Sequence, residues 1–494
     1  MTTIEQIMQS SKVTFGTSGA RGLVCDMTDQ VCYAYTLGFI QYLEQTQQIQ
    51  KKLSSIVIAG DLRKSTPRIM NACAQAIVDS GYGVINAGLI PTPAVALYGL
   101  ENHCPAIMVT GSHIPDDRNG IKFYKLSGEI LKADEAAIRE QNITLTANDF
   151  SAEGAFNDTR ECMPAVDDSA LRHYLSRYKA LFPDALLVGK KIGVYQHSSV
   201  ARDIIAELLE HLGAQVICLG FSENFIPVDT EAVREEDHKL AKQWLAEHHL
   251  DAIVSTDGDA DRPLMFDEYG HCLRGDIIGF ICARYLHIDH IVTPVSSNTC
   301  VEKANFFVAV KRTRIGSPYV IEAMNHYIED HYAAVAGYEA NGGFLLATPI
   351  RKNNHLLTAL PTRDAIIVLL SVLCNSAEQA LPLSKLLATL PARYTHSDRI
   401  KNFANEKSQQ LIARYTQSDD LKNKQSIEAD FPQFGSVIAI NTTDGLRIIF
   451  DNEDIIHFRP SGNAPEFRCY SESNSIENAQ AINKMALDTL LSAK

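Results

Sequence analysis

Residues 106–115 read Ala106-Ile107-Met108-Val109-Thr110-Gly111-Ser112-His113-Ile114-Pro115. The four apolar residues predict a short strand, and the glycine and proline that follow predict a tight loop. Ser112 therefore stands on a loop directly after a strand, where its hydroxyl can act as a nucleophile. Acyl transfer is not indicated, because the loop lacks the G-x-S-x-G pattern and no acidic partner is recognisable.

The same order of elements occurs three times along the chain. Apolar strands alternate with amphipathic helices, and the last strand leads into a polar loop at residues 110–115, 257–262 or 337–343. In open α/β sheets, ligands bind at the carboxyl ends of strands, so the three loops predict one site. The pattern predicts strands at 56–59, 84–85, 106–109, 191–195, 215–219, 252–254, 291–293, 306–310 and 333–336, and helices at 67–80, 201–212, 238–249, 276–286 and 319–330.

The last hundred residues follow a different pattern. Residues 437–440 and 446–450 flank the turn Thr443-Asp444-Gly445, which predicts a hairpin, and residues 476–491 predict a helix. This combination indicates a small α+β domain. The polar stretches 147–168 and 402–433 are predicted to be connectors. At roughly 150 residues per domain the length gives about three domains, and four also fit.

Composition excludes several classes of protein. The content of 46% hydrophobic and 21% charged residues is that of a folded globular chain, and the net charge of −14 disfavours nucleic acid and anionic membranes as partners. Eleven cysteines without a CxxC pair argue against a disulfide framework or a zinc ribbon. No basic and apolar leader opens the chain, and the apolar stretch 365–374 is shorter than the roughly 20 residues of a membrane span. We therefore expect a cytoplasmic protein.

Three aspartates alternate in the loop Asp257-Gly258-Asp259-Ala260-Asp261-Arg262. Two carboxylates about 4 Å apart repel by about 4 kcal/mol at an intermediate dielectric, and a divalent cation removes that repulsion. Oxygen ligands favour Mg²⁺, with Mn²⁺ as an alternative. An EF-hand is excluded because Arg262 stands where that loop needs glycine at its sixth position.

Other motifs supply groups for phosphates and hydroxyls. Lys122 is suited either to proton transfer or to pairing with a phosphate, and Arg21, in the glycine-rich stretch 15–22, could reach a phosphate on Ser112. Glu339 and Asn341 offer an acceptor and an amide suited to sugar hydroxyls. A phosphate cradle is predicted from the guanidinium, hydroxyl, amide and backbone donors of Arg459, Ser461, Gly462, Asn463 and Arg468.

Taken together and in this order, the five motifs resemble those of the α-D-phosphohexomutase family, over essentially the whole chain. The resemblance implies four domains around a central cleft, three of mixed α/β architecture and a C-terminal α+β domain with an antiparallel sheet. The implied domains are a phosphoserine-loop domain (1–158), a metal-binding domain (159–272), a sugar-binding domain (273–390) and a phosphate-binding domain (391–494). Gly111, Ile114 and the stretch Asn463-Ala464-Pro465 depart from the forms T-A-S-H-N-P and S-G-T-E-P that are common in the family.

The resemblance also implies a role for each site residue. The active protein would carry phosphate on Ser112, with Mg²⁺ held by Asp257, Asp259, Asp261 and that phosphate. The group being transferred would be surrounded by Arg21, His113, Lys122 and Arg262. Sugar hydroxyls would bind to Glu339 and Asn341, the phosphate that is not reacting would bind to the Arg459 loop, and Gly316 and Ser317 would line the cleft.

The implied reaction is reversible transfer of phosphate between C6 and C1 of a hexose through a hexose 1,6-bisphosphate, which also serves as activator. The resemblance is greatest to bacterial phosphomannomutases, which convert mannose 6-phosphate to mannose 1-phosphate for GDP-mannose. Glucose and glucosamine phosphates are alternative substrates. A metal-dependent sugar phosphatase and a non-catalytic sugar-phosphate-binding protein are the alternatives from other classes.

Overall fold

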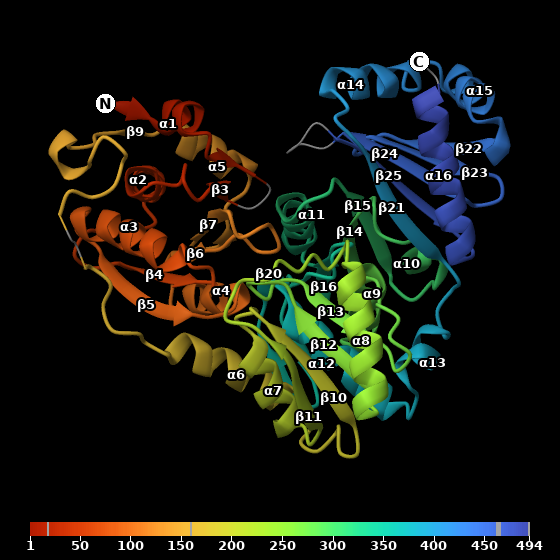
Figure 1. Cartoon of the computed structure of the whole chain (residues 1–494), viewed down its shortest axis with the longest axis horizontal. Helices are drawn as coiled ribbons and strands as arrows, with labels where there is room; N and C mark the ends of the chain where they lie inside the picture. Colours follow the sequence, from red (N-terminus) through yellow and green to blue (C-terminus); the bar gives the residue numbers. More distant parts are fainter. Residues whose placement is uncertain (17–18, 159–160, 461–465, 493–494) are drawn as a thin grey trace. The chain divides into compact units, whose positions relative to one another are not determined.

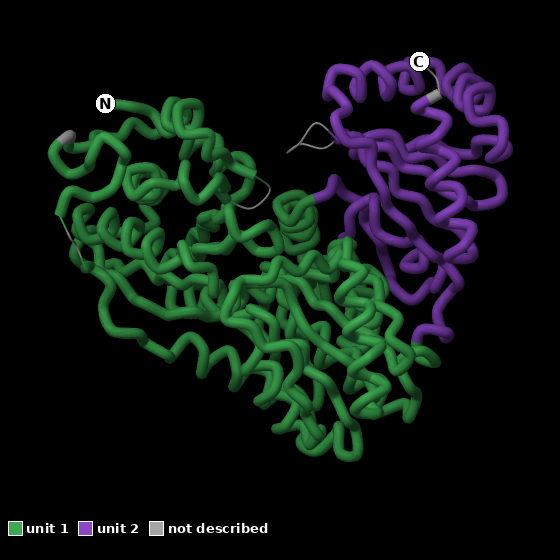
Figure 2. The backbone as a smooth tube through the Cα atoms, viewed as in Figure 1, with its two compact units in different colours: residues 1–291, 316–386 green, residues 292–315, 387–494 purple. Residues whose placement is uncertain are grey.

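The computed structural model describes residues 1–16, 19–158, 161–460 and 466–492. The chain divides into two compact units (Figure 2). Unit 1 contains residues 1–291 and 316–386, and unit 2 contains residues 292–315 and 387–494. Mixed α/β sheets in unit 1 and an antiparallel sheet in unit 2 confirm the predicted fold class. The boundaries of the four domains stay a prediction.

The first sheet of unit 1 has the strand order β2-β3-β7-β6-β4-β5, with β8 beside β7. Strand β4 is parallel to β5 and β6, whereas β7 is antiparallel to β6. Consecutive residues Val57 and Ile58 of β4 are both fully buried, so both faces of this sheet are covered. The elements are β1 (Thr2–Thr3), α1 (Ile4–Ser11), β2 (Thr14–Phe15), β3 (Ala20–Leu23), α2 (Asp29–Gln45), β4 (Ser55–Gly60), α3 (Thr66–Asp79), β5 (Gly83–Leu89), α4 (Thr92–Glu101), β6 (Ala106–Val109), β7 (Arg118–Lys125), β8 (Gly128–Glu129), α5 (Lys132–Arg139), β9 (Asn142–Ile143) and the 3₁₀ turn η1 (Ala147–Asp149).

The second sheet has the order β11-β10-β12-β13. Strand β10 is parallel to β11 and β12, and β13 is antiparallel to β12. Apolar side chains from this sheet and from α8, among them Ile253, Phe266 and Leu245, form one buried cluster. The elements are α6 (Ser169–Leu181), β10 (Lys191–His197), α7 (Arg202–His211), β11 (Gln215–Phe221), α8 (Glu235–His248), β12 (Ala252–Thr256) and β13 (Pro263–Phe266).

In the third sheet, β16, β17 and β20 are neighbours in that order and antiparallel. Helix α12 begins directly after β20, and Asp364 caps it by accepting from the backbone N–H groups of Ile366 and Ile367. No helix of the described residues is long and apolar enough to cross a lipid bilayer. The elements are α9 (Gly275–Tyr285), α11 (Ser317–Glu329), β16 (Val335–Tyr338), β17 (Phe344–Leu346), β18 (Ile350–Lys352), β19 (His355–Leu357), β20 (Leu360–Asp364), α12 (Ala365–Glu378) and α13 (Leu383–Leu387).

The three motif loops share one structural setting, and the strands on both sides of the first two loops are labelled in Figure 1. Each loop joins a strand to an antiparallel neighbour: β6 to β7, β12 to β13, and β16 to β17. The predicted strands and helices of the three segments are present, with ends that differ by at most four residues. The sequence did not predict the return strands β7, β13 and β17, which confine each loop at both ends.

Unit 2 contains an antiparallel sheet in the order β21-β25-β24-β23-β22. The prediction of a connector at 402–433 was wrong, because this stretch forms two helices and a 3₁₀ turn. Tyr415, Ile427 and Phe431 from this stretch are buried in the core with Phe458 and Phe467 of the sheet. Too few apolar residues mark these helices for a pattern to predict them. The elements are β14 (His290–Pro294), α10 (Cys300–Lys303), β15 (Ala309–Thr313), β21 (Tyr394–Lys401), α14 (Asn405–Arg414), α15 (Asp420–Asp430), η2 (Pro432–Phe434), β22 (Val437–Asn441), β23 (Leu446–Phe450), β24 (Ile455–Pro460), β25 (Glu466–Ser473) and α16 (Ile476–Ser492).

Two buried histidines predict that stability falls in mild acid. Burial lowers the pKa of His197, beside the Thr256 carbonyl, and of His457, beside the Asp444 carbonyl, to about 4 in each case. Below the ordinary pKa of about 6.5 the unfolded chain gains a proton that the folded chain does not bind. The free energy of unfolding therefore falls as the pH drops from about 6.5 to about 4, by about 3 kcal/mol per histidine.

Urea unfolding across this pH range measures the effect. The variant His457→Gln keeps a donor for the Asp444 carbonyl and does not titrate, so the stability of unit 2 should fall less steeply with acid. An equal slope in the variant and the wild type would contradict the prediction.

Candidate active site

Ser112 lies in the loop between β6 and β7, in the left-handed backbone region with a φ of 55°. This conformation is uncommon for a residue other than glycine and persists where surrounding contacts hold it. Ser112 N donates to Thr110 Oγ1 at 2.7 Å, and Thr110 Oγ1 donates to Asp61 Oδ2 at 2.8 Å. The Ser112 side chain is fully buried, and its Oγ donates to Asp257 Oδ2 at 2.5 Å. The loop therefore directs its hydroxyl at the aspartate loop.

The buried guanidinium of Arg63 also supports the loop that contains Ser112. Its nitrogens donate to four backbone carbonyls, at distances of 2.6 to 3.1 Å, and to Asp61. A Cβ atom built on Gly111 would lie 2.5 Å from Arg63 Cζ, closer than real contacts allow. Glycine is required at position 111 because the guanidinium fills the space of a side chain. The four carbonyls belong to Ser112, Ile114, Pro115 and Arg118.

This contact predicts that Gly111→Ala destabilises unit 1. Arg63 cannot swing away without losing several hydrogen bonds, so the added methyl group should cost about 1–3 kcal/mol of unfolding free energy, as overpacking does in other cores. Urea unfolding measures this cost. Gly16→Ala is the control, since its Cβ would meet its nearest atom at 3.7 Å and should change stability by less than about 0.5 kcal/mol. Equal stabilities of the two variants would contradict the packing argument.

Asp257 links the serine loop to the backbone of its own loop. Its Oδ1 accepts from the backbone N–H groups of Asp261 and Arg262, both at 3.2 Å, and its Oδ2 accepts from Ser112 Oγ. Burial and then the charges of Asp259 and Asp261 raise the pKa of the Asp257 carboxyl well above its ordinary value. The cluster is therefore a place where negative charge is costly and an added cation would stabilise it.

Asp259 and Asp261 are each held by one carboxylate oxygen. Asp259 Oδ2 accepts from Thr92 Oγ1 at 2.5 Å and from Lys122 Nζ at 2.6 Å. Asp261 Oδ2 accepts from Lys122 Nζ and from Arg363 Nη2, both at 2.7 Å. The other oxygens, Asp259 Oδ1 and Asp261 Oδ1, are buried and have no hydrogen-bond partner among the described residues. Each carboxylate is thus fixed on one side and left without a donor on the other.

The three aspartates fit a divalent cation. One carboxylate oxygen from each of Asp257, Asp259 and Asp261 lies within 4.8 Å of the other two. A buried oxygen without a hydrogen-bond partner is costly, and Asp259 and Asp261 each have one such oxygen. An all-oxygen donor set with few protein ligands is typical of Mg²⁺. This cluster can hold the predicted metal.

Basic side chains surround the aspartates. Lys122 is buried with its ammonium between Asp259 and Asp261; burial alone would lower its pKa, but the two carboxylates outweigh burial and raise it. Arg262 Nε lies 3.6 Å from Asp261 Oδ1 and 4.0 Å from Asp257 Oδ2. Both predicted basic residues therefore belong to the same cluster as the three aspartates.

His113 lies beside Ser112, and Arg21 lies within electrostatic range of Asp259 and Asp261. His113 Nδ1 is 3.3 Å from Ser112 Oγ, within hydrogen-bonding range. Burial, followed by the charges of Arg262 and Arg21, lowers the pKa of His113 well below its ordinary value. Burial and the charges of Arg262 and Arg363 lower the pKa of Arg21 to about 10. These mutual effects put His113, Arg21 and Arg262 in electrostatic range of one another.

The loop after β16 (residues 337–343), which contains the predicted sugar-binding residues, contacts the same cluster through Arg363. Arg363 Nη1 donates to Glu339 Oε2 at 3.0 Å, and Asn341 Oδ1 accepts from Gly343 N at 2.9 Å. Asn341 Nδ2 lies 3.5 Å from Glu339 Oε2. Gly342 has a φ of 87°, a left-handed conformation that favours glycine and closes the turn. Glu339 and Asn341, the two predicted sugar-binding residues, are therefore adjacent to each other, and Arg363 links Glu339 to Asp261.

Gly316 and Ser317 begin helix α11. Ser317 is fully buried, and its Oγ donates to Glu129 Oε2 at 3.0 Å. Thr362 of β20 donates to the other oxygen, Glu129 Oε1, at 2.5 Å. The Ser317 hydroxyl thus contacts a carboxylate of β8, which the sequence did not single out.

Several residues that build the site were missed from the sequence. Arg363, Thr92, Glu129, Asp61 and Arg63 belong to no recognised motif. One signal could have found two of them: Asp61 and Arg63 follow the apolar strand β4 in the way that Ser112 follows β6. A charged residue at the carboxyl end of a buried strand is the general form of that signal.

Unit 2 contains the predicted phosphate-binding arginines. Arg459 of β24 is directly opposite Arg468 of β25, and Arg468 is directly opposite Arg399 of β21. Opposite residues share a face of a sheet, so the three arginines form one row. Asp444 lies 3.0 Å from Arg459 Nε, and Glu466 accepts from Arg399 Nη1 at 3.4 Å. The other predicted members of the phosphate cradle lie outside the described residues: Ser461, Gly462 and Asn463.

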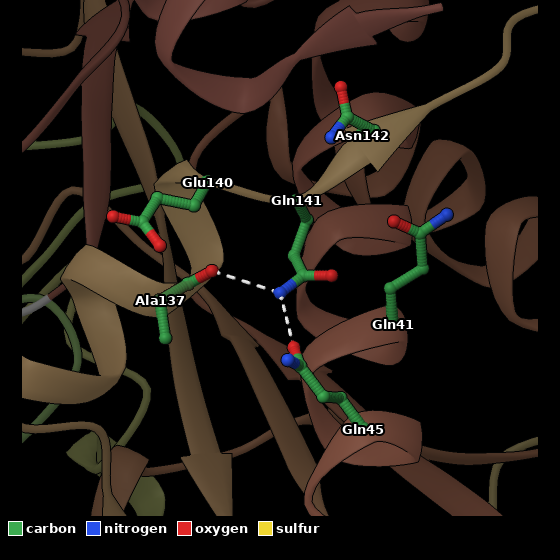
Figure 3. A pocket seen from close by; sticks show the side chains of 6 residues that line it. All are labelled: Gln41, Gln45, Ala137, Glu140, Gln141 and Asn142. Carbon is green, nitrogen blue, oxygen red and sulfur yellow. Dashed lines mark hydrogen bonds between the residues drawn. The ribbon is translucent and has the colours of Figure 1, made fainter.

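A hollow of about 490 Å³ lies on unit 1. Gln141 donates there to Gln45 Oε1 at 2.8 Å and to the Ala137 carbonyl at 3.0 Å (Figure 3). Its lining contains none of the predicted site residues, and consists of Gln41, Gln45, Ala137, Glu140, Gln141 and Asn142.

Comparison with known proteins gives consistent matches. Models of the phosphoglucomutase/phosphomannomutase family match residues 12–148 (alpha/beta/alpha domain I), 174–270 (domain II) and 274–394 (domain III). The phosphomannomutase of Salmonella muenchen is 42% identical over 491 residues, which cover 98% of this chain and 97% of that protein. The phosphomannomutase of Sinorhizobium fredii is 42% identical over 482 residues, which cover 97% of this chain and 99% of that protein. A solved structure of a phosphoglucomutase/phosphomannomutase family protein from Burkholderia thailandensis has a TM-score of 0.70 at 19% identity and covers 97% of each chain, and so has the same fold.

Proposed function

The chain belongs to the phosphoglucomutase/phosphomannomutase family, and from this premise we propose that it interconverts mannose 6-phosphate and mannose 1-phosphate. The reaction is reversible phosphoryl transfer between C6 and C1 of a hexose. The observation that carries the proposal is the buried contact of 2.5 Å between Ser112 Oγ and Asp257 Oδ2. It supports a serine that carries the phosphoryl group beside a cation site. The preference for mannose rests on the names of the two relatives at 42% identity.

The cation of this site is proposed to be Mg²⁺, held by Asp257, Asp259, Asp261 and a phosphate oxygen on Ser112. When bound, it would neutralise charge that develops on the transferred phosphoryl group. The proposal is supported by the two carboxylate oxygens without a donor and by the all-oxygen ligand set. Lys122 and Arg363 hold the opposite oxygens, which keeps the carboxylates oriented toward the cation.

Ser112 is proposed to alternate between a phosphorylated and a free hydroxyl. In one direction the bond between phosphorus and Ser112 Oγ breaks, a bond to the sugar oxygen forms, and the proton of the sugar hydroxyl ends on Ser112 Oγ. His113 Nδ1, 3.3 Å from that oxygen, is placed to relay the proton. Lys122, Arg21 and Arg262 would neutralise the phosphoryl oxygens during transfer. The contacts of Lys122 favour this charge-pairing role over proton transfer, because its ammonium already lies between two carboxylates.

The intermediate is proposed to be a hexose 1,6-bisphosphate, which turns over and returns its other phosphate to Ser112. Glu339 and Asn341 would bind ring hydroxyls in both orientations, since both ends of the sugar must reach the same serine. Gly316 and Ser317 are proposed to line the site. The phosphate that is not reacting would bind at Arg459 and Arg468 with Ser461, Gly462 and Asn463. The cytoplasmic location expected from the sequence stays a prediction.

A phosphorus NMR time course tests this function. The purified chain is mixed with Mg²⁺ and a trace of hexose 1,6-bisphosphate, and mannose 1-phosphate, glucose 1-phosphate and glucosamine 1-phosphate are supplied in separate tubes. We expect conversion to the 6-phosphates, fastest with mannose. Faster conversion of another hexose would reassign the substrate. Accumulation of free phosphate would indicate a sugar phosphatase, and binding without conversion would indicate a non-catalytic sugar-phosphate-binding protein.

A further inference from the structure

Arg363 is a buried arginine that lies outside both the aspartate loop (residues 257–262) and the loop after β16 (residues 337–343). It lies in β20, with a side chain only 3% exposed, and is followed by the cap of helix α12. Burial of a guanidinium is costly unless it is paired and hydrogen-bonded. Two carboxylates from separate loops, Asp261 and Glu339, supply the pairing.

The guanidinium binds the two carboxylates with different edges. Nε and Nη2 donate to Asp261 Oδ2, at 3.2 Å and 2.7 Å, and Nη1 donates to Glu339 Oε2 at 3.0 Å. A planar fork fixes both partners in direction as well as in distance. The sequence separation is 102 residues to Asp261 and 24 residues to Glu339. One side chain therefore bridges the loop after β12 and the loop after β16.

The bridge fixes the direction of the unpaired oxygen of Asp261. Because Arg363 and Lys122 occupy Oδ2, the other oxygen, Oδ1, is left buried without a donor among the described residues. One carboxylate oxygen of Asp261 lies within 4.8 Å of an oxygen from each of the other two aspartates. Arg363 thus holds Asp261 by Oδ2 and leaves Oδ1 available to a cation.

The loop after β16 also packs against the side chain of Arg363. A Cβ atom on Gly343 would lie 2.5 Å from Arg363 Cδ and 2.7 Å from Cγ, so glycine at this position makes room for the arginine stem. Gly343 N also donates to Asn341 Oδ1. The conformation of the loop that contains Glu339 and Asn341 therefore depends on where Arg363 lies.

We propose that Arg363 is a positioning residue that joins the cation site to the sugar site, so that one guanidinium orients both Asp261 and Glu339. The identity of the two ligands rests on the proposed function. Loss of the fork should weaken the binding of both ligands together, whereas loss of either carboxylate alone would affect mainly its own ligand.

The variant Arg363→Lys tests the bridge, because lysine keeps the charge but its single ammonium cannot reproduce the two-edged fork. Titration calorimetry with Mg²⁺ alone, on the full chain, should give an affinity weaker by about 10- to 100-fold, as for other residues that orient metal ligands. The KM for mannose 1-phosphate should rise in the same variant. Arg177→Lys is the matched control: Arg177 donates two hydrogen bonds to Thr358 and should leave Mg²⁺ affinity and KM unchanged.

Gly343→Ala provides a second test. It keeps the arginine, but the added methyl group displaces the stem of its side chain. It should weaken Mg²⁺ affinity and raise the KM as Arg363→Lys does. A folded variant of either kind with unchanged Mg²⁺ affinity would overturn the proposal, even if its melting temperature fell, because that is the result of a merely structural role. The Mg²⁺ measurement contains no sugar, so failure of the wild type to convert any hexose phosphate would count against the proposed function and not against the bridge.

Discussion

Ser112→Ala is expected to abolish mutase turnover, with a loss of at least about 10⁴-fold, while the chain stays folded. Alanine removes the oxygen that is proposed to carry the phosphoryl group and leaves the carbon framework of the loop in place. The loop keeps its support, because the backbone of residue 112 still bonds to Thr110 and Arg63. The lost hydrogen bond to Asp257 should change the free energy of unfolding by about 1–2 kcal/mol.

The phosphorus NMR assay measures turnover, urea unfolding measures stability, and intact mass measures phosphorylation of the protein after incubation with hexose 1,6-bisphosphate. Ser371→Ala is the matched control, since Ser371 is also a fully buried serine of unit 1. It should retain turnover and accept one phosphoryl group, whereas Ser112→Ala should accept none. Turnover close to that of the wild type in Ser112→Ala would remove the basis of the proposed function.

Asp259→Asn is expected to weaken Mg²⁺ binding by at least about 10- to 100-fold and to lower kcat by about 10²- to 10³-fold. The amide removes one of the negative charges that attract the cation. It also disturbs Oδ2, which accepts from Thr92 and Lys122, so the remaining ligand oxygen loses its orientation. Chelation should abolish the activity of the wild type, and added Mg²⁺ should restore it.

A titration of activity against Mg²⁺ concentration, with calorimetry of Mg²⁺ alone, checks this result. Asp267→Asn is the matched control, because Asp267 is also buried, directly follows β13 and accepts from the backbone of its own turn. The control should need the same Mg²⁺ concentration as the wild type for half-maximal activity. Identical Mg²⁺ titrations of Asp259→Asn and the wild type would show that the aspartate loop is not the cation site.

The mutase and a phosphatase built from similar parts differ in where the phosphoryl group ends. In this chain the serine, the aspartates and the flanking basic side chains are all buried or partly buried, which limits the access of water to the reacting atoms. Such a site favours return of the phosphoryl group to a sugar oxygen. Formation of free phosphate by the wild type at a rate comparable to isomerisation would contradict this reasoning.

Local sequence was enough for those parts of the site that lie within a few residues of one another. Ser112 with His113, and the three aspartates, come together because a short loop holds its own members close whatever surrounds it. The strands before these loops were predictable for the same reason, since an apolar run such as residues 106–109 is a local signal. The polar helices α14 and α15 were not, because tertiary contacts of a few residues such as Tyr415 and Ile427 outweigh their weak pattern.

By itself, then, the sequence determined the order of the motif loops and the family, and it predicted which residues supply the nucleophile, the carboxylates and the basic groups. Only the tertiary structure decided which atoms meet. Lys122 reaches Asp259 over 137 residues, Thr92 reaches it over 167, and Arg363 reaches Asp261 over 102. No local rule sets contacts at such separations. They arise when sheets and helices pack their apolar faces, because this packing brings the ends of distant strands to one place. Each buried charge is then stable only where a partner of opposite charge lies beside it.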